Sequence, residues 1–208
     1  MKNVTDRTSN PFGMRPPCDR FVPGYGDANA DFHVVGDHPG VHGGADTGVP
    51  FTNAAGERLQ EALREAGLLD AAGASPAVNR TFLSYLHMCV VDGEPTADEY
   101  GDMERFFDAE LRAIAAHVLL PVGARATKHV FENYTALTWT ADLDMADLHA
   151  TEHLGSGWLV VPILDPAEWS GDDDDRLVAG LRTLQSTDFR REVDLGRFIA
   201  GDDPYYVR

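Results

Sequence analysis

The chain of 208 residues has a mass of 22.7 kDa, which is ordinary for one domain and enough to bury a sizeable core. Its 34 aspartates and glutamates outnumber its 17 lysines and arginines, which gives a formal net charge of −17. That charge excludes nucleic-acid binding through a broad basic face, but not through a narrow site lined by a few arginines. No run of about eighteen apolar residues occurs, so no membrane-spanning helix is predicted.

The basic residues are themselves skewed, because Lys2 and Lys128 are the only lysines. An acidic, lysine-poor surface suggests a halophilic, archaeal host, where roughly molar salt shortens the Debye length to about 3 Å and screens self-repulsion. The alternative is an acidic protein of a mesophile. The N-terminus, MKNVTDRTSNPFG, lacks the apolar segment of a secretory signal, so the expected location is the cytoplasm.

In chain order, residues 1–17 are expected to form an irregular arm, and residues 18–208 a single α/β domain. A short apolar strand, residues 32–35, stops at Gly36 and opens a long Gly-rich loop. A helix follows, which Asn53 or Thr52 can cap. Long loops at the carboxyl ends of parallel strands are where α/β folds bind ligands, so this loop is the first candidate site.

The later segments continue the alternation of strands and helices. Further strands are predicted at 80–91, 118–122 and 158–164, with a short one at 136–140. Helices are predicted at 96–117, 124–131 and 176–186. A linker is expected at 70–76, and an apolar patch at Leu195, Phe198 and Ile199. Thr96 and Glu99 fit a capping box at the start of the longest helix. The pattern predicts a three-layer α/β/α fold with a central parallel sheet of about four strands.

Candidate metal ligands are few. Cys18 and Cys89 could be two buried thiols, a disulfide or remnants of a larger ligand set, and they cannot supply a four-cysteine site. His38 and His42 have helical spacing, but the glycines around them disfavour a metal-binding helix face. Residues 149–153 match the H-x-x-E-H pattern of one class of zinc peptidase, for which the alternative is solvated polar surface. No metal site is predicted.

Several short motifs occur in a fixed order along the chain. They are GDHPG at 36–40, GVPF at 48–51, AG at 55–56, LPVGARA at 120–126 and VPILDP at 161–166. In this order they resemble the uracil-DNA glycosylase superfamily, and most closely its iron–sulfur branch, whose pattern is roughly GE-x-PG, G-x-PF-x-x-x-AG, LG-x-x-A and HPS. The resemblance covers about residues 20 to 170.

The resemblance implies a DNA glycosylase, which flips a damaged nucleotide out of single- or double-stranded DNA and hydrolyses its glycosidic bond. Asp37 takes the place of the acidic residue that positions or activates water. Phe51 matches the phenylalanine on which the flipped base stacks. Gly36, His38 and Pro39 belong to the same substrate-binding loop. DNA is the implied partner, and the protein is expected to be a monomer.

Three departures from the family pattern limit this transfer of roles. Tyr85 stands where a base-reading asparagine is expected, and a phenol cannot offer the donor and acceptor of an amide. Asp165 replaces the histidine that stabilises the leaving base, and an ionised carboxylate there would oppose the developing charge unless burial keeps it protonated. With only Cys18 and Cys89 left, no iron–sulfur cluster or other cofactor is expected. The alternative function is a catalytically impaired member that binds a nucleobase, nucleic acid or partner protein without turnover.

Overall fold

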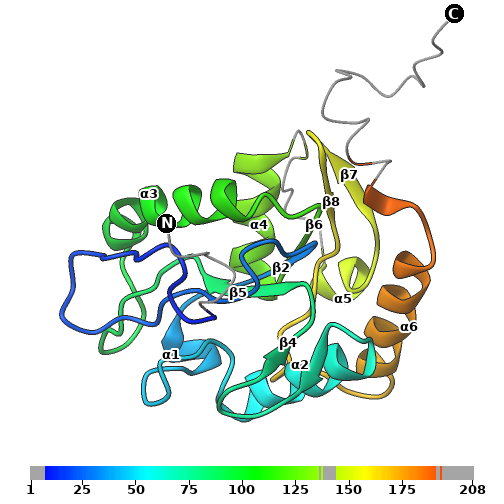
Figure 1. The fold of residues 1–208 in the computed structure, drawn as a ribbon, viewed down its shortest axis with the longest axis horizontal. Helices are drawn as coiled ribbons and strands as arrows, with labels where there is room; N and C mark the ends of the chain where they lie inside the picture. The colour runs from blue at the N-terminus through cyan, green and yellow to red at the C-terminus, as the bar shows by residue number, and fades with distance from the viewer. Residues whose placement is uncertain (1–7, 136, 138–143, 191–192, 194–208) are drawn as a thin grey trace, which may run out of the picture.

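A computed structural model describes residues 8–135, 137, 144–190 and 193, and a six-stranded sheet forms its centre (Figure 1). The strands lie in the order β1-β5-β2-β6-β8-β7. Their bounds are β1 Tyr25–Gly26, β2 Phe32–Gly36, β5 Thr81–Tyr85, β6 Val118–Pro121, β7 His153–Gly155 and β8 Trp158–Val160. Strands β5, β2, β6 and β8 are parallel, which confirms the predicted parallel sheet of about four strands. The edge strands β1 and β7 pair antiparallel and were not predicted.

Helices cover both faces of this sheet (Figure 1). Their bounds are α1 Pro39–His42, α2 Ala54–Glu65, α3 Ala97–Ile114, α4 Gly123–Tyr134, α5 Met145–Leu148 and α6 Asp173–Gln185. Helices α2 and α6 contribute leucines and valines to the larger apolar core on one face, whereas α3 and α4 pack on the other face. The three-layer α/β/α fold is therefore as predicted.

The apolar runs of the central strands follow from this double cover. Val34 of β2 packs toward the core of α2 and α6, and its neighbour Val35 toward the core of α3 and α4. Both side chains are fully buried. Strands that are covered on both faces carry continuous apolar sequences, whereas strands with one wet face alternate. The carboxyl ends of these strands all meet at one edge of the sheet, where the candidate loops emerge.

Local capping signals fix several helix starts as predicted. The Asn53 side chain accepts a hydrogen bond from the Gly56 amide and caps α2. Thr96 and Glu99 form the expected capping box at the start of α3. This helix ends at Ile114, three residues before the predicted end, because Ala115 adopts a left-handed conformation with φ of 50°. A left-handed residue at this position is a common helix terminator.

Several predicted bounds were wrong. The first two residues of the predicted linker at 70–76 belong to β3, Leu69–Ala71, which pairs with β4, Ala77–Val78, in a separate two-stranded sheet. The second strand ends at Tyr85 rather than at residue 91, and the fourth ends at Val160, shortly before Pro162, which has no amide hydrogen to donate.

Other predictions fall on residues that lie outside the described part of the chain. They are the strand at 136–140, apart from Leu137, and the apolar patch at 195–199. Within the described residues, no helix is long and apolar enough to cross a membrane.

Candidate active-site pocket

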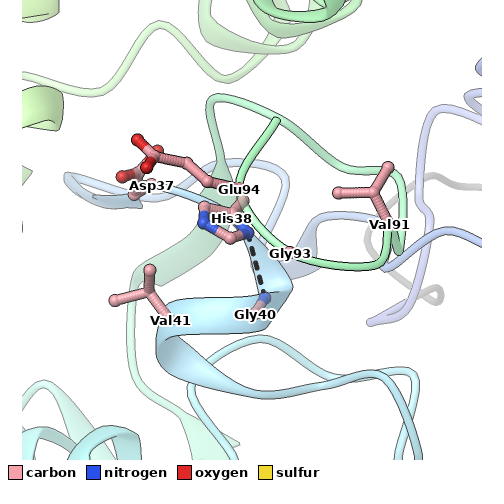
Figure 2. A pocket seen from close by; sticks show the side chains of 7 residues that line it. All are labelled: Asp37, His38, Gly40, Val41, Val91, Gly93 and Glu94. Atoms are coloured by element: carbon pink, nitrogen blue, oxygen red, sulfur yellow. Dashed lines mark hydrogen bonds between the residues drawn. The ribbon is translucent and has the colours of Figure 1, made fainter. Parts of the chain in front are cut away.

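The first candidate residue, Asp37, follows β2 directly and lines a pocket of about 500 Å³ (Figure 2). The wall of this pocket comes from the loop and helix after β2 and from the chain after β5, and it is formed by Asp37, His38, Gly40, Val41, Val91, Gly93 and Glu94. A volume of this size is within the usual range for small-ligand sites. The predicted loop thus does border a cavity at the carboxyl edge of the sheet.

Two side chains that the sequence analysis missed hold the Asp37 carboxylate. The Tyr100 hydroxyl from α3 donates a short hydrogen bond to Asp37 Oδ1, and Arg125 Nε from α4 donates to Oδ2 at 3.2 Å. The Arg125 guanidinium lies over the Tyr100 ring, 4.7 Å from its centroid, and pairs with Glu94 across the pocket wall. Burial and the bond to Asp37 raise the pKa of Tyr100, so the phenol remains a neutral donor. The carboxylate is therefore fixed in orientation.

His38, Pro39 and Gly36 have structural functions in this loop. His38 Nδ1 accepts a hydrogen bond from the Gly40 amide at 3.1 Å and caps α1, and Pro39 occupies the first turn, where its missing amide hydrogen costs nothing. Burial lowers the pKa of His38, which favours the neutral ring that this acceptor role needs. A Cβ at Gly36 would lie within 2.8 Å of the rings of Tyr85 and Phe51, so only glycine fits there.

Phe51 and Tyr85 are brought together, but not around this pocket. Phe51 is 1% exposed and Tyr85 is fully buried, with ring centroids 5.3 Å apart. The Tyr85 hydroxyl accepts from the Phe51 amide at 2.7 Å and donates to the Gly43 carbonyl at 3.0 Å. The His42 ring covers both aromatic rings, 5.3 Å from that of Phe51 and nearly parallel to that of Tyr85. In this conformation the covered Phe51 ring offers no exposed face on which a base could stack.

Asp165 lies beyond β8, where the bridge between Val122 and Ile163 extends the parallel pairing. Its Oδ2 is 3.6 Å from His42 Nε2, and Oδ1 accepts from the Ala167 amide. Burial raises the pKa of Asp165, but the nearby His42 ring and the hydrogen bond from the Ala167 amide outweigh it and leave the pKa below its usual value. The carboxyl group is therefore ionised at neutral pH. Asp165 does not line the Asp37 pocket.

The H-x-x-E-H segment does not form a zinc-binding helix. Helix α5 ends at Leu148, and His153 belongs to β7, so the two histidines do not share a helix face. His149 is fully buried, accepts from the Leu164 amide at Nδ1 and lies 2.8 Å from the Asp173 carbonyl at Nε2. Among the described residues no cluster of three or more potential ligands can hold a metal ion. The segment is also not solvated surface throughout, because His149 joins the end of β8 to α6.

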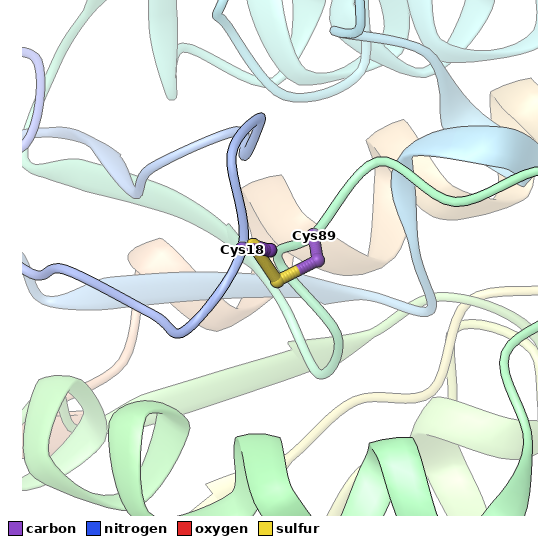
Figure 3. The surroundings of a disulfide bond; sticks show 2 residues. All are labelled: Cys18 and Cys89. Carbon is purple, nitrogen blue, oxygen red and sulfur yellow. A yellow bond between two sulfur atoms is a disulfide. The ribbon is translucent and has the colours of Figure 1, made fainter.

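The two cysteines form a disulfide whose Cα atoms are 6.1 Å apart (Figure 3). This result selects one of the three possibilities that the sequence left open. Backbone bonds on either side, from Val22 to Met88 and from Val90 to Arg20, align the two segments. The disulfide therefore ties the N-terminal part of the domain to the chain that leads into the pocket wall. It also leaves no thiol to bind an iron–sulfur cluster, so the side chains present do not fit that cofactor.

Two comparisons relate the chain to known proteins. A model of the uracil DNA glycosylase superfamily matches residues 23–179. A type-5 uracil-DNA glycosylase of Thermus thermophilus is 36% identical over 106 residues, which span 48% of this chain and 48% of the relative. The matched family region contains the whole parallel sheet and the helices that cover it, except the part of α6 after residue 179. The chain belongs to the uracil-DNA glycosylase superfamily.

Proposed function

We propose that the protein is a divergent DNA glycosylase, which hydrolyses the N-glycosidic bond of a flipped uracil or other damaged base. The observation that carries this proposal is the Asp37 carboxylate, held at the wall of a ligand-sized pocket in a member of this superfamily. The name of the Thermus relative gives uracil in DNA as its substrate, which supports the same reaction class.

Asp37 suits the task of positioning water. Tyr100 and Arg125 each occupy one carboxylate oxygen, and an ionised carboxylate has about four acceptor sites, so sites remain for a water molecule. A fixed carboxylate can orient that water toward the sugar carbon and stabilise the positive charge that develops as the glycosidic bond breaks. Since Asp37 is 16% exposed, the water has access from the pocket.

The surroundings of Tyr85 and Asp165 favour an altered base over plain uracil. The Tyr85 hydroxyl is used within the protein, and no amide stands there to read a uracil edge. The Asp165 carboxylate is negative, which opposes a departing base anion. Loss of one stabilising donor typically lowers kcat by about a hundred- to a thousandfold. Slow release of uracil is therefore expected from this enzyme.

The test uses single- and double-stranded oligonucleotides that contain uracil, hypoxanthine or xanthine, incubated at several salt concentrations and then cleaved with alkali at abasic sites. Asp37→Asn is expected to lower release by at least about 100-fold. Asp108→Asn is the matched control, because Asp108 pairs with Arg112 on the surface of α3, away from the pocket. If no base is released from any strand, or if the Asp37 variant keeps the wild-type rate, the proposal is wrong.

The second candidate function is binding without turnover, and the closed packing of His42 over Phe51 favours it. In that case the protein should bind strands with an abasic site or a modified base and release nothing. Equilibrium binding by fluorescence anisotropy would measure this. Rapid excision of uracil would end this alternative.

The remaining expectations are part of the same proposal. We propose that DNA is the partner, that the protein is a cytoplasmic monomer, and that it works without an iron–sulfur cluster because Cys18 and Cys89 form a disulfide. The assignment to the iron–sulfur branch and the halophilic host stay predictions. With a net charge of −17, DNA binding should improve as added salt screens repulsion, opposite to the usual salt dependence, until counterion release dominates.

A further inference from the structure

His42 is a buried polar side chain without a hydrogen-bond partner. It is 1% exposed, and neither Nδ1 nor Nε2 finds a partner among the described residues. Buried polar atoms of this kind are uncommon, because they lose their bonds to water and gain nothing in return. A buried imidazole with neither nitrogen bonded therefore calls for a functional explanation.

The neighbours of His42 fix its direction. Its ring lies nearly parallel to that of Tyr85, at an angle of 15°, and packs against Phe51 on another side. The Tyr85 hydroxyl is engaged by Gly43 and by the Phe51 amide, so it cannot serve His42. The remaining direction leads to Asp165, whose Oδ2 is 3.6 Å from His42 Nε2. The aromatic rings thus aim the imidazole at one carboxylate.

Asp165 in turn connects His42 with the open edge of the sheet. Its side chain is about one quarter exposed, and a Cβ at Gly123 would lie 4.0 Å from Oδ2. No other atom outside the adjoining residues lies within 4 Å of that Cβ position, so the space beside Gly123 and Asp165 is open. The order β2-β6-β8 places the ends of β2 and β8 two strand spacings apart, which is about 10 Å. Asp37 and Asp165 can therefore face opposite ends of one bound nucleoside.

We propose that His42 and Asp165 act as one imidazole–carboxylate pair at the base end of the site, with His42 as the positioning residue behind Asp165. This inference rests on the proposed function. The C1′–N bond breaks and its electrons go to the base, while the water oxygen bonds to C1′ and one water proton passes to Asp37. A proton held by the pair passes through Asp165 to the base nitrogen, and exchange with solvent then restores both groups.

Other titratable groups around His42 do not supply the charge. Burial raises the pKa of Tyr85 far above neutrality, so this phenol stays uncharged. Burial also lowers the pKa of His38, which caps the short helix that ends at His42, and this ring therefore stays neutral as well. Asp165 is thus the charged partner that faces the His42 ring. A proton shared between His42 Nε2 and Asp165 Oδ2 would offset the negative charge of the carboxylate, which alone would repel a departing base.

The kinetic test compares base release by wild type, His42→Gln, Asp165→Asn and the double variant between pH 5 and 9, with His153→Gln as control on the β7 edge. We expect His42→Gln to lower kcat by about 100-fold with KM changed less than twofold, and to remove the loss of rate at high pH. The double variant should be no slower than the slower single one, since the residues act as a unit. A wild-type rate and pH profile in His42→Gln, or multiplied effects in the double variant, would overturn the inference.

A second readout does not depend on turnover or on the folding of the His42 variant. The imidazole resonance of His42 is followed by NMR against pH in wild type and in Asp165→Asn, with and without millimolar hypoxanthine. The pair predicts a lower titration midpoint in Asp165→Asn, and a hypoxanthine-induced shift in wild type only. An unchanged midpoint overturns the inference even if the enzyme is active. If wild type releases no base, the proposed function fails, and the titration alone decides about the pair.

Discussion

Two aspartates flank strand β2, and they differ in what surrounds them. Asp31 precedes the strand and is 5% exposed; it binds Arg80 and Arg190 and lies 3.6 Å from His117. Asp37 follows the strand, binds one arginine and one tyrosine, and borders the pocket. The Asp31 carboxylate is bound by side chains of the protein itself, whereas the Asp37 carboxylate has acceptor sites left on the side that faces the pocket. An aspartate with a basic partner is therefore a functional candidate only where space is left beside it.

The largest expected effect on stability concerns the disulfide between Cys18 and Cys89, which holds the chain that leads into the pocket wall beside Asp37. The bond joins residues 71 positions apart, and reduction of such a bond should lower the free energy of unfolding by about 4 kcal/mol. Urea unfolding with and without reductant measures it. The double variant Cys18→Ser/Cys89→Ser should be destabilised equally and should not respond to reductant. Equal stability with and without reductant would show that the bond does not form in solution.

The two aspartates themselves should separate activity from stability. Asp37→Asn should lower base release by at least about 100-fold, with little change in stability. Asp31→Asn should instead lower the free energy of unfolding by about 2 kcal/mol, because it leaves two arginines without their buried partner, and base release per folded molecule should persist. Thermal unfolding and oligonucleotide cleavage on the same preparations compare them. Reversed effects would refute the distinction.

Asp31 also predicts a response to acid. Burial raises its pKa, but Arg190, Arg80 and His117 together bring the pKa below its ordinary value. The folded pKa is thus lower than the unfolded one, so this stabilisation is present above about pH 4 and is lost as the pH falls through the folded pKa. The acid midpoint of unfolding should rise in Asp31→Asn.

A third carboxyl group, that of Glu110 in α3, is fully buried, and so is His33 in β2, whose Nε2 lies 2.7 Å from the Ser84 hydroxyl. Burial raises the pKa of Glu110 from 4.5 to about 8, and burial lowers that of His33 to about 3. The folded pKa of Glu110 is the higher one, so its stabilisation is complete below pH 4.5 and is lost as the pH rises through 8. Wild type should lose at least about 1 kcal/mol between pH 6 and 8, and Glu110→Gln should not. Parallel pH profiles would refute this.

The smallest effect is expected for Tyr100. Tyr100→Phe removes the donor to Asp37 Oδ1 but keeps the ring under Arg125. Base release should fall about fivefold, because the Asp37 carboxylate loses one of the two side chains that fix its orientation. Tyr134→Phe, on the far end of α4, serves as control. A wild-type rate of base release in Tyr100→Phe would mean that Tyr100 does not orient Asp37.

Much of the fold could be predicted because its signals are local. The caps at Asn53 and Thr96 and the apolar strand runs need only a few neighbouring residues. Asp37 could be found in the same way, since it directly follows a buried strand. Its partners could not be found, because Tyr100 and Arg125 lie 63 and 88 positions away. His149 was misread as polar surface for the same reason.

The sequence also could not predict that other side chains cover the Phe51 ring. It depends on the conformation of His42 and on a hydroxyl of Tyr85 that bonds two backbone groups. The GVPF motif at 48–51 suggests that Phe51 is a stacking platform, but it contains no information about which ring packs on top of Phe51. Predicting such packing requires the relative placement of three loops, and no periodicity in the chain records that placement.

Strand β2 has one consequence for measurement. It pairs in parallel with β5 and β6 over nearly its whole length, so it cannot slide without breaking both ladders. Six residue steps separate Asp31 from Asp37, which corresponds to about 20 Å. The strand thus holds its two ends at a fixed separation. Spectroscopic labels near the two ends of β2 would measure this distance before and after DNA is added. A change in the distance would arise from the loops, and it could be assigned to them without a second structure.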